Sequence, residues 1–346
     1  MKKSLIALAV AGAFAAPAFA ATSNVDVYGK LHMSVSMFDD QDEGLATDEY
    51  DGTNDLQISS NASRIGFKGS EDLGGGLNAI WQIESGVNLD EQTGTLSSRN
   101  SFVGLNGGFG TVLLGNHDTP LKLVGRAVDL FGDTMADSRN VLGGGSDARA
   151  RNVVAYVSPN FSGFAFAGAY ATDAFDGNGN NGDTENVGVY NLNATYTNGP
   201  IYVGVGYGDG DGHEALGLGA HMRVAGGLTF GSAKVVAQYD SLEDDTAFGM
   251  DYAAWMVGGS YTMGAIVLKA NYMEGEVDNC IGAACEPSQW TIGADYNLSK
   301  RTSVYALYAN GEAITVGGGV SSTDQVGPAV VGGDISVLSL GMVHTF

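Results

Sequence analysis

The ionisable residues best suited to chemistry gather between positions 117 and 151. Carboxylates and basic side chains alternate there over a short distance: Asp118, Asp129, Asp133, Asp137 and Asp147, with Lys122, Arg126, Arg139, Arg149 and Arg151. Facing charges of opposite sign set an electric field across the space between them. Because the two signs balance, the direction of any net selectivity does not follow from the sequence.

Catalysis would require a nucleophile, a base and an orienting group held close together. The chain has five histidines, and none lies in a serine-hydrolase or metal-binding motif: His32, His117, His213, His221 and His344. The nucleophile pattern G-x-S-x-G is absent. A structural role explains His117, beside Asp118, more simply than catalysis does. The sequence therefore predicts that the protein is not an enzyme.

The first twenty residues have the pattern of a secretory signal peptide. Lys2 and Lys3 precede an apolar run, and the segment closes on the cleavage pattern Ala18-Phe19-Ala20. We therefore expect residues 1–20 to be removed and residues 21–346 to form one domain. After residue 20, no apolar run approaches the ~18 residues of a membrane helix. An exported protein without a helical anchor is expected.

Export also bears on the two cysteines, Cys280 and Cys285, in "DNCIGAACEP". In an oxidising compartment such a pair is expected to form a disulfide. A metal site is the alternative, but it would need more ligands nearby. The disulfide would stiffen one loop, because so small a ring removes little chain entropy.

The composition is acidic and rich in glycine. Asp and Glu number 39 against 16 Lys and Arg, and the formal net charge is −23. Such acidity argues against a nucleic-acid partner, which needs clustered basic residues. The 53 glycines follow no three-residue period and accompany many aromatics, which is typical of turn-rich β structure.

Long alternating segments are the elements that must position the charged residues. In "VDVYGKLHMSVSMF" (25–38), Val25, Val27, Leu31, Met33, Val35 and Met37 share one face, whereas Asp26, Tyr28, Lys30, His32, Ser34 and Ser36 share the other. An edge strand of a soluble sandwich is the simpler alternative. Such strands usually run about five or six residues, whereas membrane strands need about nine to eleven.

The alternation recurs in sixteen segments. They are 24–38, 56–69, 77–87, 99–106, 111–116, 150–158, 164–172, 187–197, 201–208, 220–230, 233–240, 254–263, 265–273, 289–298, 302–310 and 337–346. Short and long connections alternate between them, which is typical of an outer-membrane barrel. We therefore predict a 16-stranded antiparallel transmembrane β-barrel, wide enough to leave an aqueous channel. A soluble β-sandwich does not explain this pattern.

Five motifs resemble one family in order along the whole mature chain. They are "SRIGFKGSEDLGGGLNAIWQIESGV" (63–87), "RNSFVGLNGGFGTVLLGN" (99–116), "NVVAYVSPNFSGFAFAGAY" (152–170), "YNLSKRTSVYALYAN" (296–310) and "LGMVHTF" (340–346). Together they resemble the general diffusion porins of Gram-negative bacteria, most closely the beta-proteobacterial branch. The resemblance implies an outer-membrane homotrimer without a cofactor, through which small hydrophilic solutes diffuse. It also implies that the third long loop, 117–149, folds inward and narrows each pore.

Candidate residues of the pore wall follow from strand alternation and from the resemblance. Alternation places Arg64 and Lys68 on the wet face opposite Ile65 and Phe67, and Lys30 on the wet face of the first strand. The resemblance implies that Arg64 and Arg149 line the constriction, with Arg99 and Arg151 near positions where further arginines occur. Val103 and Leu105 share the alternation of Arg99 and would point outward without a bulge. The facing loop acids are Asp118, Asp129, Asp133 and Asp137. Rim salt bridges or phosphate contacts are the alternative role for the arginines.

The final segment, "SVLSLGMVHTF", is expected to be the sixteenth strand and to pair with the first. Leu338, Leu340, Met342, His344 and Phe346 fall on every second residue. An alternating apolar end on Phe346 also resembles the signal that the barrel-assembly machinery recognises.

The remaining acids concentrate in long loops, above all in 39–55, and recur near 173–185, 209–214 and 243–245. A solvated rim is the simpler explanation. Weak divalent-cation binding, bridging lipopolysaccharide phosphates, is the alternative, because Ca²⁺ prefers clustered oxygen ligands. Two other functions stay open: a porin that prefers small anions or organic acids, and a surface adhesin-type barrel.

Overall fold

The computed structural model describes residues 24–40, 56–90, 99–143, 147–172, 188–210, 219–243, 251–280, 285–314 and 333–346. The predicted signal peptide, 1–20, lies outside these ranges, so its boundary stays a prediction. No helix within the described ranges has the length and apolar character needed to cross a membrane.

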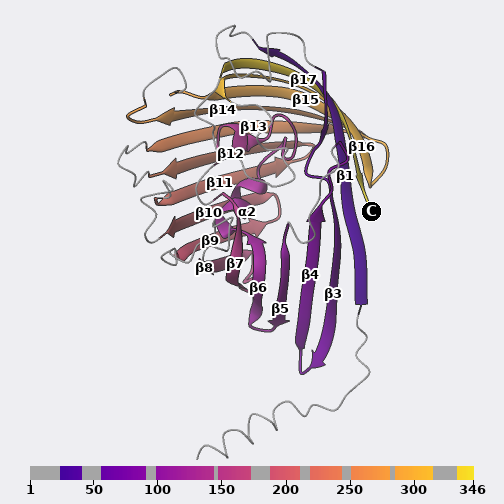
Figure 1. Ribbon diagram of the computed structural model, residues 1–346, viewed down its shortest axis with the longest axis vertical. Coiled ribbons are helices and arrows are strands. Elements are labelled where there is room, and N and C mark those ends of the chain that lie inside the picture. The colour runs from indigo at the N-terminus through magenta and orange to yellow at the C-terminus, as the bar shows by residue number, and fades with distance from the viewer. Residues whose placement is uncertain are drawn as a thin grey trace, which may run out of the picture.

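The described chain forms one closed antiparallel sheet (Figure 1). Its strands are β1 (Asn24–Asp40), β2 (Leu56–Ser60), β3 (Arg64–Gly74), β4 (Leu77–Gly86), β5 (Ser101–Gly107), β6 (Gly110–Asp118), β7 (Arg149–Val157), β8 (Phe164–Thr172), β9 (Gly188–Asn198), β10 (Ile201–Gly210), β11 (His221–Phe230), β12 (Ala233–Leu242), β13 (Tyr252–Met263), β14 (Ile266–Val277), β15 (Ser288–Asn297), β16 (Thr302–Ile314) and β17 (Gly333–Thr345). Both β2 and β3 pair with β1 and occupy one strand position, so the barrel has sixteen strands. The sixteen-stranded prediction is confirmed.

The segment predicted as one strand over 56–69 is interrupted between β2 and β3. Ala62 takes a positive φ of 50°, which turns the chain out of the extended conformation. The Ser63 hydroxyl accepts a hydrogen bond from the His32 backbone N–H at 2.9 Å and donates one to the His32 carbonyl at 3.1 Å. A side chain therefore satisfies backbone groups of β1 where the ladder is broken.

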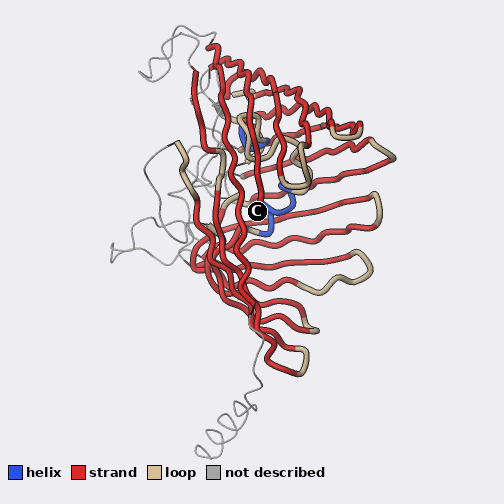
Figure 2. Tube along the Cα trace, turned by 90° about the vertical axis from the view of Figure 1, so that its right-hand side faces the viewer, coloured by secondary structure: helices blue, strands red, loops and turns tan. Residues whose placement is uncertain are grey.

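The tight turns lie along one edge of the barrel, on the right of Figure 2. Gly75 and Gly76 connect β3 to β4, with φ values of 62° and 80° that favour glycine. Strand β3 runs on to Gly74, five residues beyond the predicted end. The connection expected between the segments 56–69 and 77–87 is therefore a two-residue turn, and the alternation of short and long connections is confirmed.

The two faces of the wall differ as the alternation predicts. On β1, Val25, Val27, Val35 and Met37 are exposed on the outside. Ser34 and Ser36, which alternate with them, are buried on the inside. Aromatic rings lie on the outer surface of neighbouring strands, as in the Trp255–Tyr272 and Trp290–Tyr308 pairs. The outer face is therefore apolar and suited to lipid.

The barrel closes where β17 pairs with β1, and the C-terminus lies beside β1 in Figure 1. The Phe346 N–H donates to the Gly29 carbonyl at 3.1 Å, and the Gly29 N–H donates to the Phe346 carbonyl at 3.0 Å. A Cβ atom on Gly29 would lie 2.4 Å from the Phe346 ring, so only glycine admits that ring. The expected pairing of the last strand with the first is confirmed.

Between β6 and β7 the chain forms α2 (Pro120–Arg126) and the short 3-10 helix η1 (Ser138–Asn140). The Thr119 hydroxyl caps α2 by accepting from the Lys122 N–H at 3.2 Å, and Pro120 occupies the first turn. The helix ends at Arg126, so Val128 and Leu130 lie beyond it. The role of the apolar residues is packing: Val124 and Val128 lie in one cluster with buried side chains of β11, β12, β13 and β14.

Candidate functional site

Three basic side chains converge on the carboxylate of Asp133 in the segment between β6 and β7. Lys30 of β1 places its Nζ 2.8 Å from Asp133 Oδ2, and Arg64 of β3 places Nη1 3.6 Å from the same oxygen. Arg126, at the end of α2, pairs with the other oxygen through Nη2. Lys30 and Arg64 are direct partners in the β1–β3 register. Two predicted wall residues and one predicted loop acid thus meet.

The segment also holds its own charges in place. Arg126 Nη1 lies 2.9 Å from Asp137 Oδ2 and 3.8 Å from Asp129 Oδ2. Arg139 Nε lies 2.9 Å from Asp137 Oδ1. The Asp133 N–H donates to Asp137 at 2.7 Å, and Asp133 takes a positive φ of 61°. Arg126 therefore organises three of the predicted loop acids.

These contacts shift the pKa values of the loop carboxyl groups in opposite directions. Burial would raise the pKa of Asp133, but Arg126 and Lys30 outweigh it and hold the pKa well below its usual range. Arg139 and Arg126 likewise overcome burial and lower the pKa of Asp137 to about 2. Burial, with the adjacent Asp137 charge, raises the pKa of Asp129 to about 6. Asp129 is thus the one of these three carboxyls that titrates near neutrality.

Glu84 of β4 links Arg64 to Arg99. It lies 2.7 Å from Arg99 Nε and 3.9 Å from Arg64 Nε, and it accepts a hydrogen bond from the Tyr28 hydroxyl at 2.9 Å. Sequence reasoning missed Glu84, although its alternation with the exposed Ile83 was the available signal. Arg99 precedes β5, which begins at Ser101 and not at the predicted residue 99. Because Arg99 lies before the strand, it does not share the outward orientation of Val103, and its side chain is buried.

Arg149 and Asp118 lie in a second cluster at the base of the segment. Asp118 Oδ1 lies 3.0 Å from Arg149 Nη2 and 3.2 Å from Lys122 Nζ. Asn100 donates to Asp118 at 3.0 Å and accepts from Arg149 Nε at 2.6 Å. This network ties the end of β6 to the start of β7. The structure thus does not bring Arg149 to the Asp133 carboxylate.

The other two predicted wall cations are more exposed. Lys68 lies on the same face of β3 as Arg64, and its Nζ is 5.2 Å from the centre of the Tyr28 ring. Arg151 of β7 is exposed beside Asn152, whose φ is 53°. A register shift between Gly115 and His117 breaks the simple alternation there.

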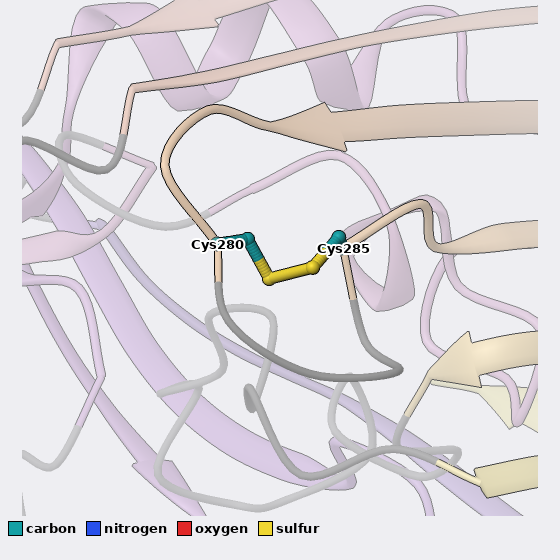
Figure 3. Close-up of a disulfide and its surroundings, with 2 residues drawn as sticks. All are labelled: Cys280 and Cys285. Atoms are coloured by element: carbon teal, nitrogen blue, oxygen red, sulfur yellow. A yellow bond between two sulfur atoms is a disulfide. The ribbon is translucent and has the colours of Figure 1, made fainter.

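Cys280 and Cys285 are joined by a disulfide between β14 and β15 (Figure 3). Their Cα atoms are 5.5 Å apart. The Val277 N–H at the end of β14 donates to the Cys285 carbonyl at 2.9 Å, so the bridge continues the pairing of the two strands.

Most of the acidic loops lie outside the described residues, including 41–55, 173–187, 211–218 and 244–250. The cation-binding prediction for them is not tested by the structure. In the parts of the chain that are described, no three His, Cys, Asp or Glu side chains gather in a way that could hold a metal ion.

A family model described as Gram-negative porin matches residues 7–315. The chain belongs to the Gram-negative porin family. It is 31% identical over 352 residues to the major outer membrane protein P.IB of Neisseria lactamica, covering 94% of this chain and 98% of that protein. It is 31% identical over 349 residues to outer membrane porin protein 32 of Delftia acidovorans, covering 92% of each. Matches to two P.IB proteins of Neisseria gonorrhoeae span 55% of their length.

Solved porin structures share the fold. An anion-selective porin from Comamonas acidovorans superposes with a TM-score of 0.72 at 25% identity, covering 94% of this chain and 100% of that one. OmpT of Vibrio cholerae, in a trimer form, superposes with a TM-score of 0.69 at 21% identity, covering 94% of this chain and 99% of that one. This porin is therefore an outer-membrane β-barrel protein. Its family and fold point to a channel rather than to an enzyme.

Proposed function

We propose that this porin is a general diffusion channel for small hydrophilic solutes and ions, narrowed by the segment 117–149 and biased towards anions. Solutes would pass by size and charge, without a chemical step. A porin that prefers small anions or organic acids is the second candidate. The convergence of Lys30, Arg64 and Arg126 on one carboxylate favours it, because the same groups are suited to bind a carboxylate on a solute.

Contacts of the segment with distant strands support the narrowing. Val141 and Leu142 pack with Ala225 of β11, Met256 of β13 and Met273 of β14. Phe131, Met135 and Ala136 pack with residues of β1, β16 and β17. In both cases the wall residues alternate with exposed outer residues, so the contacts are on the inner face. Contacts with the inner face over this much of a closed sheet support a segment that occupies part of the lumen.

The proposed anion preference rests on the unequal solvent exposure of basic and acidic side chains. In the cluster around Asp133, the side chains of Arg64 and Arg126 are each 26% exposed. The carboxylates of Asp133, Asp129 and Asp137 are 10%, 2% and 0% exposed. A passing ion therefore meets guanidinium groups, with the carboxylates behind them. A related porin that is described as anion-selective supports the same direction.

Reversal potentials in a planar bilayer under a salt gradient test this proposal. Arg64→Gln should move the reversal potential towards cations, because it removes a partly exposed positive charge at the Asp133 cluster. Lys300→Gln is the matched control: it removes one positive charge from the exposed connection between β15 and β16 and should have little effect. A wild-type channel that selects cations, or an unchanged potential in Arg64→Gln, would contradict the anion bias. Block of the current by one organic acid at low concentration would favour the second candidate.

We extend the proposal to assembly and surroundings. A homotrimer is supported by the related porin in a trimer form and by the apolar outer face of β1. Conductance that appears in steps of three would agree with it, and single independent steps would contradict it. Divalent cations at the acidic loops would bridge lipopolysaccharide phosphates. Calcium should then raise the melting temperature in lipopolysaccharide-containing bilayers, and no change would remove this role.

A further inference from the structure

Arg223 of β11 makes a buried ionic contact at the far end of the constricting segment. Its guanidinium binds both oxygens of Asp240 on β12, with Nε 2.8 Å from Oδ1. Its Nη1 binds Asp147, which lies two residues before β7. All three side chains are at most 3% exposed. Gln238 donates to Asp240 at 3.0 Å, and His221 Nε2 lies 3.5 Å from Asp240.

The same guanidinium also lies directly beneath α2. A Cβ atom on Gly125 would be 2.5 Å from Arg223 Nη1 and 3.1 Å from Gln238 Oε1. Only the absence of a side chain at position 125 allows the helix to lie this close. Arg223 therefore contacts the segment near its beginning, at Gly125, and again near its end, at Asp147. Residues 126–142, which carry Arg126, Asp129, Asp133 and Asp137, lie between these two contacts.

We propose that Arg223 is a positioning residue for the constriction: it holds both ends of the segment 125–147 against β11 and β12, and thereby sets how far the Asp133 cluster projects into the lumen. A buried carboxylate left without its partner is strongly unfavourable. Loss of the contact would therefore release the segment rather than leave an unpaired charge beneath it. This inference rests on the proposed function, because it assigns a position to the element that narrows the channel.

Asp147→Asn is the sharpest test. It removes the charge that ties the segment to Arg223 but keeps Arg223 paired with Asp240, so the wall itself stays intact. In proteoliposome swelling, the uptake of a tetrasaccharide relative to that of a monosaccharide should rise severalfold. Trypsin should also cleave the folded variant after Arg126 or Arg139, where the wild type resists.

Asp295→Asn is the matched control, because it too removes one carboxylate from an inner-wall ion pair, with Lys269 at 2.9 Å, on β14 and β15. It should alter charge selectivity but leave the size ratio and the trypsin resistance unchanged. Arg223→Lys should fall between the wild type and Asp147→Asn, since an ammonium cannot reproduce the forked contact with two carboxylates. A size ratio in Asp147→Asn equal to that of the wild type, in channels that conduct, would overturn the inference. A wild type that does not conduct would overturn the proposed function instead.

Discussion

At the residue scale, the charge selectivity of the proposed constriction depends on how far each charge is shielded rather than on how many charges there are. Five acids and five bases between 117 and 151 cancel in the sequence. In the structure, Asp129 and Asp137 are covered while Arg126 stays partly open. Strand alternation was enough to identify Lys30 and Arg64. It could not single out Asp133 among the four predicted loop acids as their partner, because Asp133 lies in an irregular segment whose path is set by tertiary packing.

Asp129 should make the selectivity depend on pH. Its pKa is raised to about 6 by burial and by Asp137, whereas the pKa values of Asp133 and Asp137 are lowered. Between pH 7 and pH 5, Asp129 therefore gains a proton and the loop loses one negative charge. We expect the reversal potential to move towards anions over this window. Asp129→Asn should lack this part of the shift.

The same raised pKa has a consequence for stability with a definite sign. The folded state binds a proton at Asp129 more tightly than the unfolded state, whose ordinary value is near 3.8. The contribution of this group is present at low pH and is lost as the pH rises towards about 6. Asp133 acts in the opposite sense: its contribution is present above the ordinary carboxyl pKa and is lost only as the pH falls well below it. For the selectivity prediction, a reversal potential of the wild type that does not change between pH 7 and pH 5 would contradict the role of Asp129.

At the element scale, the strands follow from the sequence and their irregularities do not. Alternation located all sixteen strand positions, because a wall between lipid and water imposes a period of two. The break at Asn61–Ser63 was missed, since it depends on hydrogen bonds to a strand some thirty residues earlier. The Arg223 contacts were missed for the same reason, although Arg223 alternates with the exposed Met222 and Val224.

Ser63→Ala should destabilise the barrel at the break. The hydroxyl accepts from the His32 N–H, which would lose this partner, whereas the His32 carbonyl still accepts from the Asn61 N–H at 2.8 Å. We expect a cost of about 1–3 kcal/mol in the free energy of unfolding, measured by urea titration of the refolded barrel. Ser70→Ala is the control, because Ser70 lies exposed on the same strand, β3. Equal stability of the two variants would show that the hydroxyl contributes little.

At the scale of the whole molecule, the fold and the family were predictable because the pattern is repeated in every strand. The role predicted for the acidic loops stays a prediction, because most acidic residues of 39–55 lie outside the described residues. The cations that contact Asp133 belong to β1, β3 and α2, so this cluster exists only once the segment between β6 and β7 packs against the first strands.

Phe346→Ala should impair assembly more than conductance. The Phe346 ring lies over Gly29 at the seam between β1 and β17, and the resemblance implies a role in recognition by the assembly machinery. We expect less heat-modifiable, folded protein in outer membranes and normal conductance from the channels that do insert. Phe230→Ala, which removes another exposed aromatic of the outer surface, should assemble normally. Normal assembly of Phe346→Ala would contradict this role.

The seam between β1 and β17 also constrains the order of folding. Its partners, such as Lys30 and Thr345, come from opposite ends of the described chain. Neighbouring strands elsewhere can pair as local hairpins, but this last pairing must wait until every intervening strand has been made and threaded into place. Until then the sheet has two free edges, each able to join a strand from another molecule. A chain that has not yet closed is therefore open to aggregation until β17 meets β1.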